Sequence, residues 1–427
     1  MTPCCTPNSR SICQPRGPNR TRSLVQAREA GMKPESIAHA LEAQGAWRPR
    51  LRITAVRVHQ LAARLREPFG WSLNWTQTRT ATLVEVVTDA GLTGWGEGYC
   101  DAGLLRQRAD RLLGRSPFEL EAIYEEMRAP GGPQQRPGPC ATPGLDIALW
   151  DLVGKALEMP VSALLGRQYR THVMPYVTAL YRKQRPDFCE ALVEEARCWA
   201  NLGYRALKMK TGYSPELDLQ AVAAVREAIG PEIALAIDSN CAYDAGTALR
   251  IGVRLEQFNL IWWEEPLVAD DLAGYRHLRQ ALRIPLAAGE TGSLDWLVLH
   301  YVQPSLIDIL QPDLGNIGLT GARLLTQLCH LNHIRLIPHN WGTALNTAAT
   351  LQWVSTSPPL TPALNPPEPM LEFDQTEHPF RDALVAQRIA PDTPGGALAV
   401  PNGPGLGVSV IPEAVAEFRT GLLTIPA

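Results

Sequence analysis

The segment Ala206-Leu207-Lys208-Met209-Lys210 ends a short apolar run with two lysines. Only five of the chain's 40 basic residues are lysines, so two of them two positions apart are unusual here. Successive side chains of a strand point to opposite faces, so Lys208 and Lys210 share one face. Two neighbouring ammonium groups repel each other, and repulsion lowers the pKa of one of them. The pair therefore predicts a lysine that acts as a general base near neutral pH.

Single charged residues recur after this segment at nearly even steps of 23 to 33 residues. They are Asp238, Glu264, Glu290, Asp313, His339 and Glu372. One strand–helix unit of a barrel takes about 30 residues, so each of them could end a successive strand. Because the C-terminal strand ends of a parallel barrel face one mouth, we expect these side chains to meet there with both lysines.

Short apolar segments alternate with helix-length stretches from about residue 171 onward. The apolar segments are 173–177, 206–209, 233–237, 260–263, 285–288, 307–310 and 334–337. Strands that alternate with helices form parallel strand–helix units. Seven or eight such units in about 200 residues favour a closed barrel over an open sheet.

Composition and pattern divide the chain into four expected parts. Residues 1–50 are expected to be a disordered extension, although an Arg-rich start without Asp or Glu up to Arg28 is also typical of transit peptides. Residues 51–167 show strands followed by helices, which predicts an α+β domain. Residues 168–378 are expected to form the barrel. Residues 379–427 fall outside the repeat, and we expect them to pack back onto the first domain.

The overall composition argues against several classes of partner. A net charge of −3 gives no reason to expect nucleic acid or an anionic membrane. We find no apolar run of about 18 residues, so no spanning helix is indicated. Nine cysteines, an odd number without a Cys-x-x-Cys pair, indicate a reducing compartment and hence a cytoplasmic location.

The three carboxylates at the central steps predict a metal site. Asp238, Glu264 and Glu290 each stand at or just beyond an apolar strand. Three carboxylates that converge on one point repel one another strongly unless a cation lies between them. Oxygen ligands select a hard divalent ion, and Mg²⁺ leaves room for water or substrate oxygens.

Asp313 and His339 end the next two predicted strands, so their side chains are expected within hydrogen-bond reach. A carboxylate fixes the tautomer of an imidazole and favours its protonated form. The pair is thus a second acid/base device, across the mouth from Lys210. Glu372 could hydrogen-bond a developing enediolate oxygen if it is protonated, or it could be a salt-bridge partner.

Taken as a set, these motifs resemble the mandelate racemase subgroup of the enolase superfamily. The motifs are Lys-x-Lys at 208–210, Asp-x-Asn at 238–240, Glu-Glu-Pro at 264–266, Gly-Glu at 289–290, Pro-Asp at 312–313 and Pro-His-Asn-Trp-Gly at 338–342. The resemblance extends from about Leu51 to the C-terminus. It implies a modified TIM barrel, (β/α)7β, with an N-terminal α+β capping domain.

The resemblance also implies roles for individual residues. Asp238, Glu264 and Glu290 would bind Mg²⁺. Lys210 would be the base on one face of the substrate, with Lys208 polarising the substrate carboxylate. The catalytic set would be completed by Asp313, His339 and Glu372.

Substrate contacts are implied as well. Capping-domain loops at about Phe69–Ser72 and Tyr99–Asp101 would cover the substrate. The candidate substrate-binding residues are Trp71, Tyr99 and Asn240. The family often assembles, so a homo-oligomer is expected.

Within the subgroup, acid-sugar dehydratases and galactarolactone cycloisomerases are most similar, notably at 365–374 and 401–407. They imply removal of the proton next to a carboxylate of an acid sugar or its lactone, then β-elimination. Racemisation or epimerisation of a 2-hydroxy acid could use the same site. Two other classes stay open: a Schiff-base aldolase, which needs no carboxylate cluster, and a non-catalytic sugar-acid binder.

Overall fold

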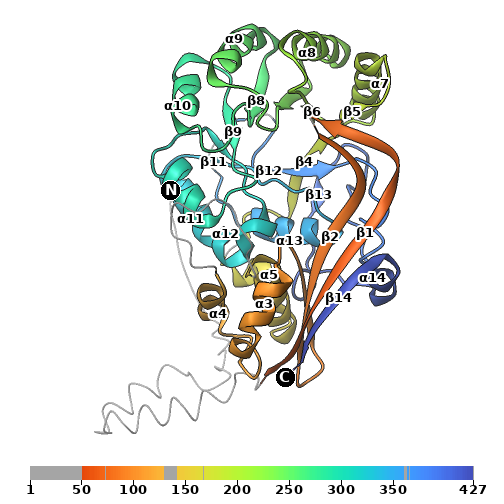
Figure 1. Ribbon diagram of the computed structural model, residues 1–427, viewed down its shortest axis with the longest axis vertical. Coiled ribbons are helices and arrows are strands. Elements are labelled where there is room, and N and C mark those ends of the chain that lie inside the picture. The colour runs from red at the N-terminus through yellow and green to blue at the C-terminus, as the bar shows by residue number, and fades with distance from the viewer. Residues whose placement is uncertain are drawn as a thin grey trace, which may run out of the picture. The chain divides into compact units, whose positions relative to one another are not determined.

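The computed structural model describes residues 51–72, 74–128, 142–166, 168–359, 363–364 and 366–426. The extension predicted for residues 1–50 lies outside the described residues. Residues 51–427 form one compact unit, in which an antiparallel sheet with its helices lies beside a parallel barrel (Figure 1).

The antiparallel sheet has the strand order β14-β1-β2-β3. Its strands are β1 (Ile53–Trp71), β2 (Asn74–Thr88), β3 (Thr93–Glu97) and β14 (Arg419–Pro426). The helices that follow β3 are α3 (Ala102–Arg108), α4 (Leu120–Met127), α5 (Thr142–Ala156) and α6 (Val161–Leu164). Strand β14, near the C-terminus, pairs with β1, so the last strand of the chain joins the sheet that its first strands form.

Two glycines of β3 let helix α5 lie directly on the sheet. A Cβ atom at Gly94 would stand 2.1 Å from the carbonyl oxygen of Ala148. A Cβ atom at Gly96 would stand 2.2 Å from the carbonyl oxygen of Gly144. Backbone atoms cannot yield as a flexible side chain can, so this close contact requires glycine at both positions.

The barrel strands are parallel and run in the order β11-β10-β9-β8-β7-β6-β4-β12. Their bounds are β4 (His172–Thr178), β6 (Ala206–Lys210), β7 (Ala234–Asp238), β8 (Leu260–Glu264), β9 (Leu286–Ala288), β10 (Ile309–Leu310), β11 (Arg335–Leu336) and β12 (Met370–Asp374). The last strand pairs with the first, Met370 beside Met174. This arrangement confirms the predicted modified barrel.

A helix follows each of these strands except β12. The helices are α7 (Phe188–Asn201), α8 (Pro215–Ile229), α9 (Ala245–Leu255), α10 (Leu272–Ala281), α11 (Leu294–Leu297), α12 (Leu314–Leu331) and α13 (Ala344–Val354). Short polar residues begin several of them: Ser214 Oγ accepts from Leu217 N at 3.2 Å, and Asp244 Oδ1 accepts from Thr247 N at 2.9 Å. Such caps satisfy backbone donors that the helix leaves open.

The interior of the barrel explains the spacing of the charged residues. Alternate side chains of neighbouring strands, including Ala206, Ala236 and Trp262, form one buried cluster. One period further along the strands stand Lys208 and Glu264, on the same inward face. Trp263 points the other way, into the outer core.

Two short strands join the barrel to its surroundings. Strand β5 (Arg182–Lys183) pairs with the end of β1, Gly70 opposite Arg182. Phe69, Gly70 and Trp71, predicted as part of a covering loop, are therefore the last residues of β1. Strand β13 (Leu398–Ala399) pairs with β4, and helix α14 (Pro412–Phe418) leads into β14.

Within the described part of the chain, no helix combines the length and the apolarity needed to cross a lipid bilayer.

Candidate active site

The register of the parallel strands brings the predicted charged residues together at one end of the barrel. Lys210 stands opposite Asp238, and Asp238 stands opposite Glu264 in the next strand. Asp313 and His339 form a bridge just beyond β10 and β11. All of these positions lie at C-terminal strand ends, where the spacing predicted them.

The two lysines are buried among carboxylates. Lys208 Nζ donates to both oxygens of Glu264, at 3.0 and 2.9 Å, and lies 2.8 Å from Glu372 Oε1. Lys210 Nζ contacts Asp238 and donates to Asn240 Oδ1 at 2.9 Å.

The carboxylates by themselves raise the pKa of both lysines, opposite to the predicted lowering. Burial alone would lower the pKa of both side chains, but the carboxylates outweigh it. Glu264 and Glu372 raise the pKa of Lys208, and Asp238 raises that of Lys210. The repulsion of Lys210 by Lys208 is present but smaller. The spacing of the two lysines in the sequence predicted their repulsion. It could not show how many carboxylates surround them.

Asp238, Glu264 and Glu290 can hold a metal ion. They each offer an oxygen, and the three oxygens lie within 4.8 Å of one another. Burial raises the pKa of Glu264 to about 7 against the opposite effect of Lys208. Glu290 Oε2 is buried and has no hydrogen-bond partner among the described residues. Hard oxygen donors, one of them a buried oxygen that accepts no hydrogen bond, fit Mg²⁺.

His339 and Asp313 form the predicted pair. Nδ1 of His339 lies 2.6 Å from Oδ2 of Asp313, while Nε2 faces Glu290 Oε2 at 3.5 Å. Burial alone would lower the pKa of His339, but Glu290, Glu372 and Asp313 raise it to about 10. These three carboxylates therefore favour the protonated ring, whose Nε2 faces the mouth.

Glu372 is an ionised acceptor, so its predicted role as a protonated donor does not fit the structure. Its oxygens accept from Thr178 Oγ1 at 2.5 Å and from Asn340 N at 2.8 Å. Burial would raise the pKa of Glu372, but Lys208 and His339 hold it well below its usual range. The salt-bridge alternative is the one that the contacts favour.

The three candidate substrate-binding residues lie around this centre. Asn240 contacts Lys210, as above. Trp71 stands edge-on to Tyr181 and Trp341, with ring centroids 6.4 and 5.7 Å away. Tyr99 is 64 % exposed, and the negative charge of Asp313 is the largest cause of its raised pKa. Whether any of them contacts substrate stays a prediction.

Several residues of the mouth escaped the sequence analysis. Thr178 and Asn340 hold Glu372; Asn340 stands next to His339 in sequence, which was an available signal. Glu97, at the end of β3, accepts from Thr343 N at 3.0 Å and so anchors the loop after His339. Arg79 reaches the mouth from β2, and nothing in its local sequence indicates that.

Comparison with known proteins places the fold and the site in a family. Residues 52–166 match the N-terminal domain of the mandelate racemase / muconate lactonizing enzyme family, and residues 191–414 match the enolase C-terminal domain-like family. The chain is an enzyme of the enolase superfamily, of the isomerase or lyase type. More narrowly, it belongs to the mandelate racemase / muconate lactonizing enzyme family, as the sequence motifs predicted.

Two relatives illustrate the range of activities. A D-galactarolactone cycloisomerase of Agrobacterium fabrum is 36 % identical over 378 residues, which cover 86 % of this chain and 99 % of the relative. A D-gluconate dehydratase of Thermoproteus tenax is 30 % identical over 365 residues, 81 % of this chain and 71 % of the relative.

Solved structures agree with this placement. The 3,6-anhydro-D-galactonate cycloisomerase of Zobellia galactanivorans superimposes with a TM-score of 0.75 at 33 % identity, covering 87 % of this chain and 100 % of the other. An L-talarate/galactarate dehydratase of Salmonella typhimurium, liganded with Mg and L-lyxarohydroxamate, superimposes with a TM-score of 0.74 at 25 % identity. The match covers 88 % of this chain and 95 % of the other.

Proposed function

We propose that this enzyme removes the proton next to a carboxylate of an acid sugar or its lactone and then eliminates a β-oxygen. The observation that carries the proposal is the placement of Lys210 and His339 on two sides of one carboxylate cluster. A proton next to a carboxylate is too weakly acidic for either group to remove unaided. Such chemistry needs positive charge at the carboxylate, where the enediolate develops.

Asp238, Glu264 and Glu290 would hold Mg²⁺. When bound there, the ion would supply positive charge beside the substrate carboxylate. Lys208, fixed between Glu264 and Glu372, adds a buried cation beside the carboxylate cluster. The carboxylates that raise the pKa of Lys210 and His339 include the proposed metal ligands Asp238 and Glu290, so a bound cation would offset that effect. Lys210 or His339 would then take the α-proton, according to the face on which the substrate presents it.

When Lys210 is the base, a protonated His339 suits the second half of such a reaction. Its Nε2–H faces the cluster and can protonate a departing oxygen, while Asp313 keeps the proton on Nδ1. Loss of hydroxide would give dehydration, and loss of a lactone ring oxygen would give cycloisomerisation. We favour the second because the two cycloisomerases named above are 36 % and 33 % identical to this chain, more than the two dehydratases at 30 % and 25 %.

Racemisation or epimerisation is the second candidate. Acid/base groups on both faces of one site permit removal of the proton by one group and its return by the other. The same residues would carry it, so only the product distinguishes the two reactions.

The test is a screen of hexarates, their lactones and aldonates with Mg²⁺ in D₂O, followed by proton NMR. Loss of the α-proton signal with a rearranged lactone or a 3-deoxy-2-keto product supports elimination. An epimer that carries deuterium at the α-carbon supports the second candidate. A ligand that binds without any exchange contradicts both and favours a binding protein.

A further inference from the structure

Arg79 belongs to β2 of the capping domain, yet its side chain ends at the barrel mouth. It is 2 % exposed, and Nη2 donates to Asp374 Oδ2, at the end of β12. Asp374 also accepts from Arg381 and, at 2.9 Å, from Thr376 N. A guanidinium buried to this degree is costly unless it is paired. The pairing with Asp374 therefore fixes where Arg79 lies.

The other face of this guanidinium covers Trp341. Cζ of Arg79 stands 3.6 Å from the centroid of the indole ring, a close cation–π contact. Trp341 follows His339 and Asn340 directly, and Asn340 N donates to Glu372 Oε2 at 2.8 Å. The stacked ring thus belongs to the loop that carries His339.

Trp341 also meets the end of strand β1 of the capping domain. Its ring lies 5.7 Å from that of Trp71 and 6.4 Å from that of Phe69, edge-on in both cases. Its Nε1 atom is buried and has no hydrogen-bond partner among the described residues. A buried N–H without an acceptor is unfavourable. A ligand oxygen that accepts a hydrogen bond from Trp341 Nε1 would therefore be stabilised there.

We propose that Trp341 Nε1 donates a hydrogen bond to an oxygen of the substrate, and that Arg79 is the positioning residue that aims the indole. The acceptor would be a hydroxyl or carbonyl oxygen at the end of the sugar acid away from the reacting carboxylate. The proposal rests on the proposed function for the identity of the substrate. The stacking of Arg79 on the His339 loop does not depend on it.

Trp341→Phe tests the donor, because it keeps an aromatic ring and removes the N–H. We expect KM to rise about 3- to 10-fold, the range for one neutral hydrogen bond, with a smaller change in kcat. Arg79→Gln should raise KM and lower kcat together, because the loop that carries His339 loses its support. Arg79→Lys, which restores the charge without the planar stack, should recover part of the loss.

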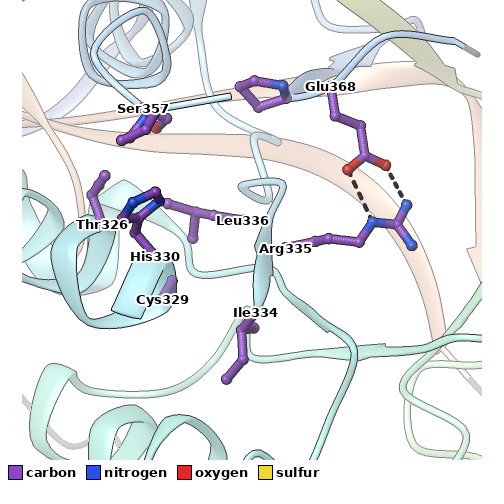
Figure 2. Close-up of a pocket in the computed structure, with 10 residues that line it drawn as sticks. Thr326, Cys329, His330, Ile334, Arg335, Leu336, Ser357 and Glu368 are labelled. Atoms are coloured by element: carbon purple, nitrogen blue, oxygen red, sulfur yellow. Dashed lines mark hydrogen bonds and ion pairs between the residues drawn. The ribbon is translucent and has the colours of Figure 1, made fainter. Parts of the chain in front are cut away.

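Arg335→Gln is the matched control. Figure 2 shows Arg335 paired with Glu368 in the lining of a pocket. Nε of Arg335 lies 2.9 Å from Oε2 of Glu368, at the N-terminal ends of β11 and β12. It is a part-buried arginine–carboxylate pair at the opposite end of the strands from the mouth. Its loss should lower Tm and leave KM and kcat unchanged when assayed below the midpoint.

Amide hydrogen exchange gives a readout that needs no substrate. Residues 339–347 should exchange faster in Arg79→Gln than in the wild type, and Arg335→Gln should leave them unchanged. Unchanged KM in Trp341→Phe would overturn the donor. Unchanged exchange in Arg79→Gln, or an equal loss of activity in Arg335→Gln, would overturn the positioning role. If the wild type processes no candidate sugar acid, the proposed function fails, and amide exchange still judges Arg79.

Discussion

Asp313 contacts two different partners with its two carboxylate oxygens. Oδ2 lies 2.6 Å from Nδ1 of His339, and Oδ1 accepts from Gly315 N, also at 2.6 Å, at the start of α12. The residue that orients the imidazole is therefore itself held by a helix N-terminus. Charge and position are coupled in one side chain, and substitutions can separate them.

Asp313→Asn keeps an acceptor for Gly315 and removes the charge beside His339. The pKa of His339 should fall, because one of the groups that raise it is gone. We expect kcat/KM for β-elimination to fall by about 10²- to 10⁴-fold, the usual contribution of a general acid or base. A pH profile and an NMR titration of His339 would check this.

Asp308→Asn is the control for this substitution. Asp308 precedes the same strand, β10, at its other end, and it pairs with Arg279 at 3.2 Å. Its replacement should affect stability and spare the pH profile. An unchanged His339 titration in Asp313→Asn would contradict the role given to Asp313.

Mg²⁺ should stabilise the folded chain. An ion that binds the native state alone raises the free energy of unfolding by about 2.7 kcal/mol at a hundredfold excess over Kd. We expect Tm to rise with added Mg²⁺ and to return after EDTA. Glu290→Gln should remove the shift, whereas Glu256→Gln, outside the cluster, should keep it. A shift that persists in Glu290→Gln would place the ion elsewhere.

The spacing of the charged residues was sufficient to predict the barrel, because strand ends in a parallel barrel share one mouth. It was also sufficient to bring Asp238, Glu264 and Glu290 together. The ionisation of Lys208, Lys210 and Glu372 was not predictable in this way. It depends on how many opposite charges surround each group in three dimensions, and Arg79 and Glu97 reach the mouth from another domain.

Gly96→Ala should destabilise the capping domain. The new Cβ would stand 2.2 Å from the carbonyl oxygen of Gly144, so α5 would have to move off the sheet. Overpacking of this kind costs about 1–3 kcal/mol. Gly246→Ala, in the first turn of α9, serves as the control. Its new Cβ would stand 3.3 Å from Asp244 Oδ1 and 3.6 Å from Arg250 Nη1, both side-chain atoms. Chemical denaturation would compare the two, and equal midpoints would contradict the close contact.

Glu97 should make stability depend on pH. Burial raises its pKa from 4.5 to about 7, against the hydrogen bonds from Thr343 and Asn346. Between these values the folded chain keeps a proton that the unfolded chain has lost. The contribution of Glu97 to stability is thus fully present below about pH 4.5 and is lost as the pH rises to about 7.

Glu97→Gln cannot titrate, so this contribution should disappear from its pH dependence. Relative to the wild type, the variant should gain on the order of 3 kcal/mol between pH 4.5 and 8, at 1.36 kcal/mol per pKa unit. Urea unfolding of both proteins at several pH values measures the difference. Glu417→Gln changes an exposed residue of α14, and its curve of unfolding free energy against pH should run parallel to that of the wild type. A Glu97→Gln curve that also runs parallel would mean that Glu97 is ionised in the folded chain, held by the donors at the start of α13.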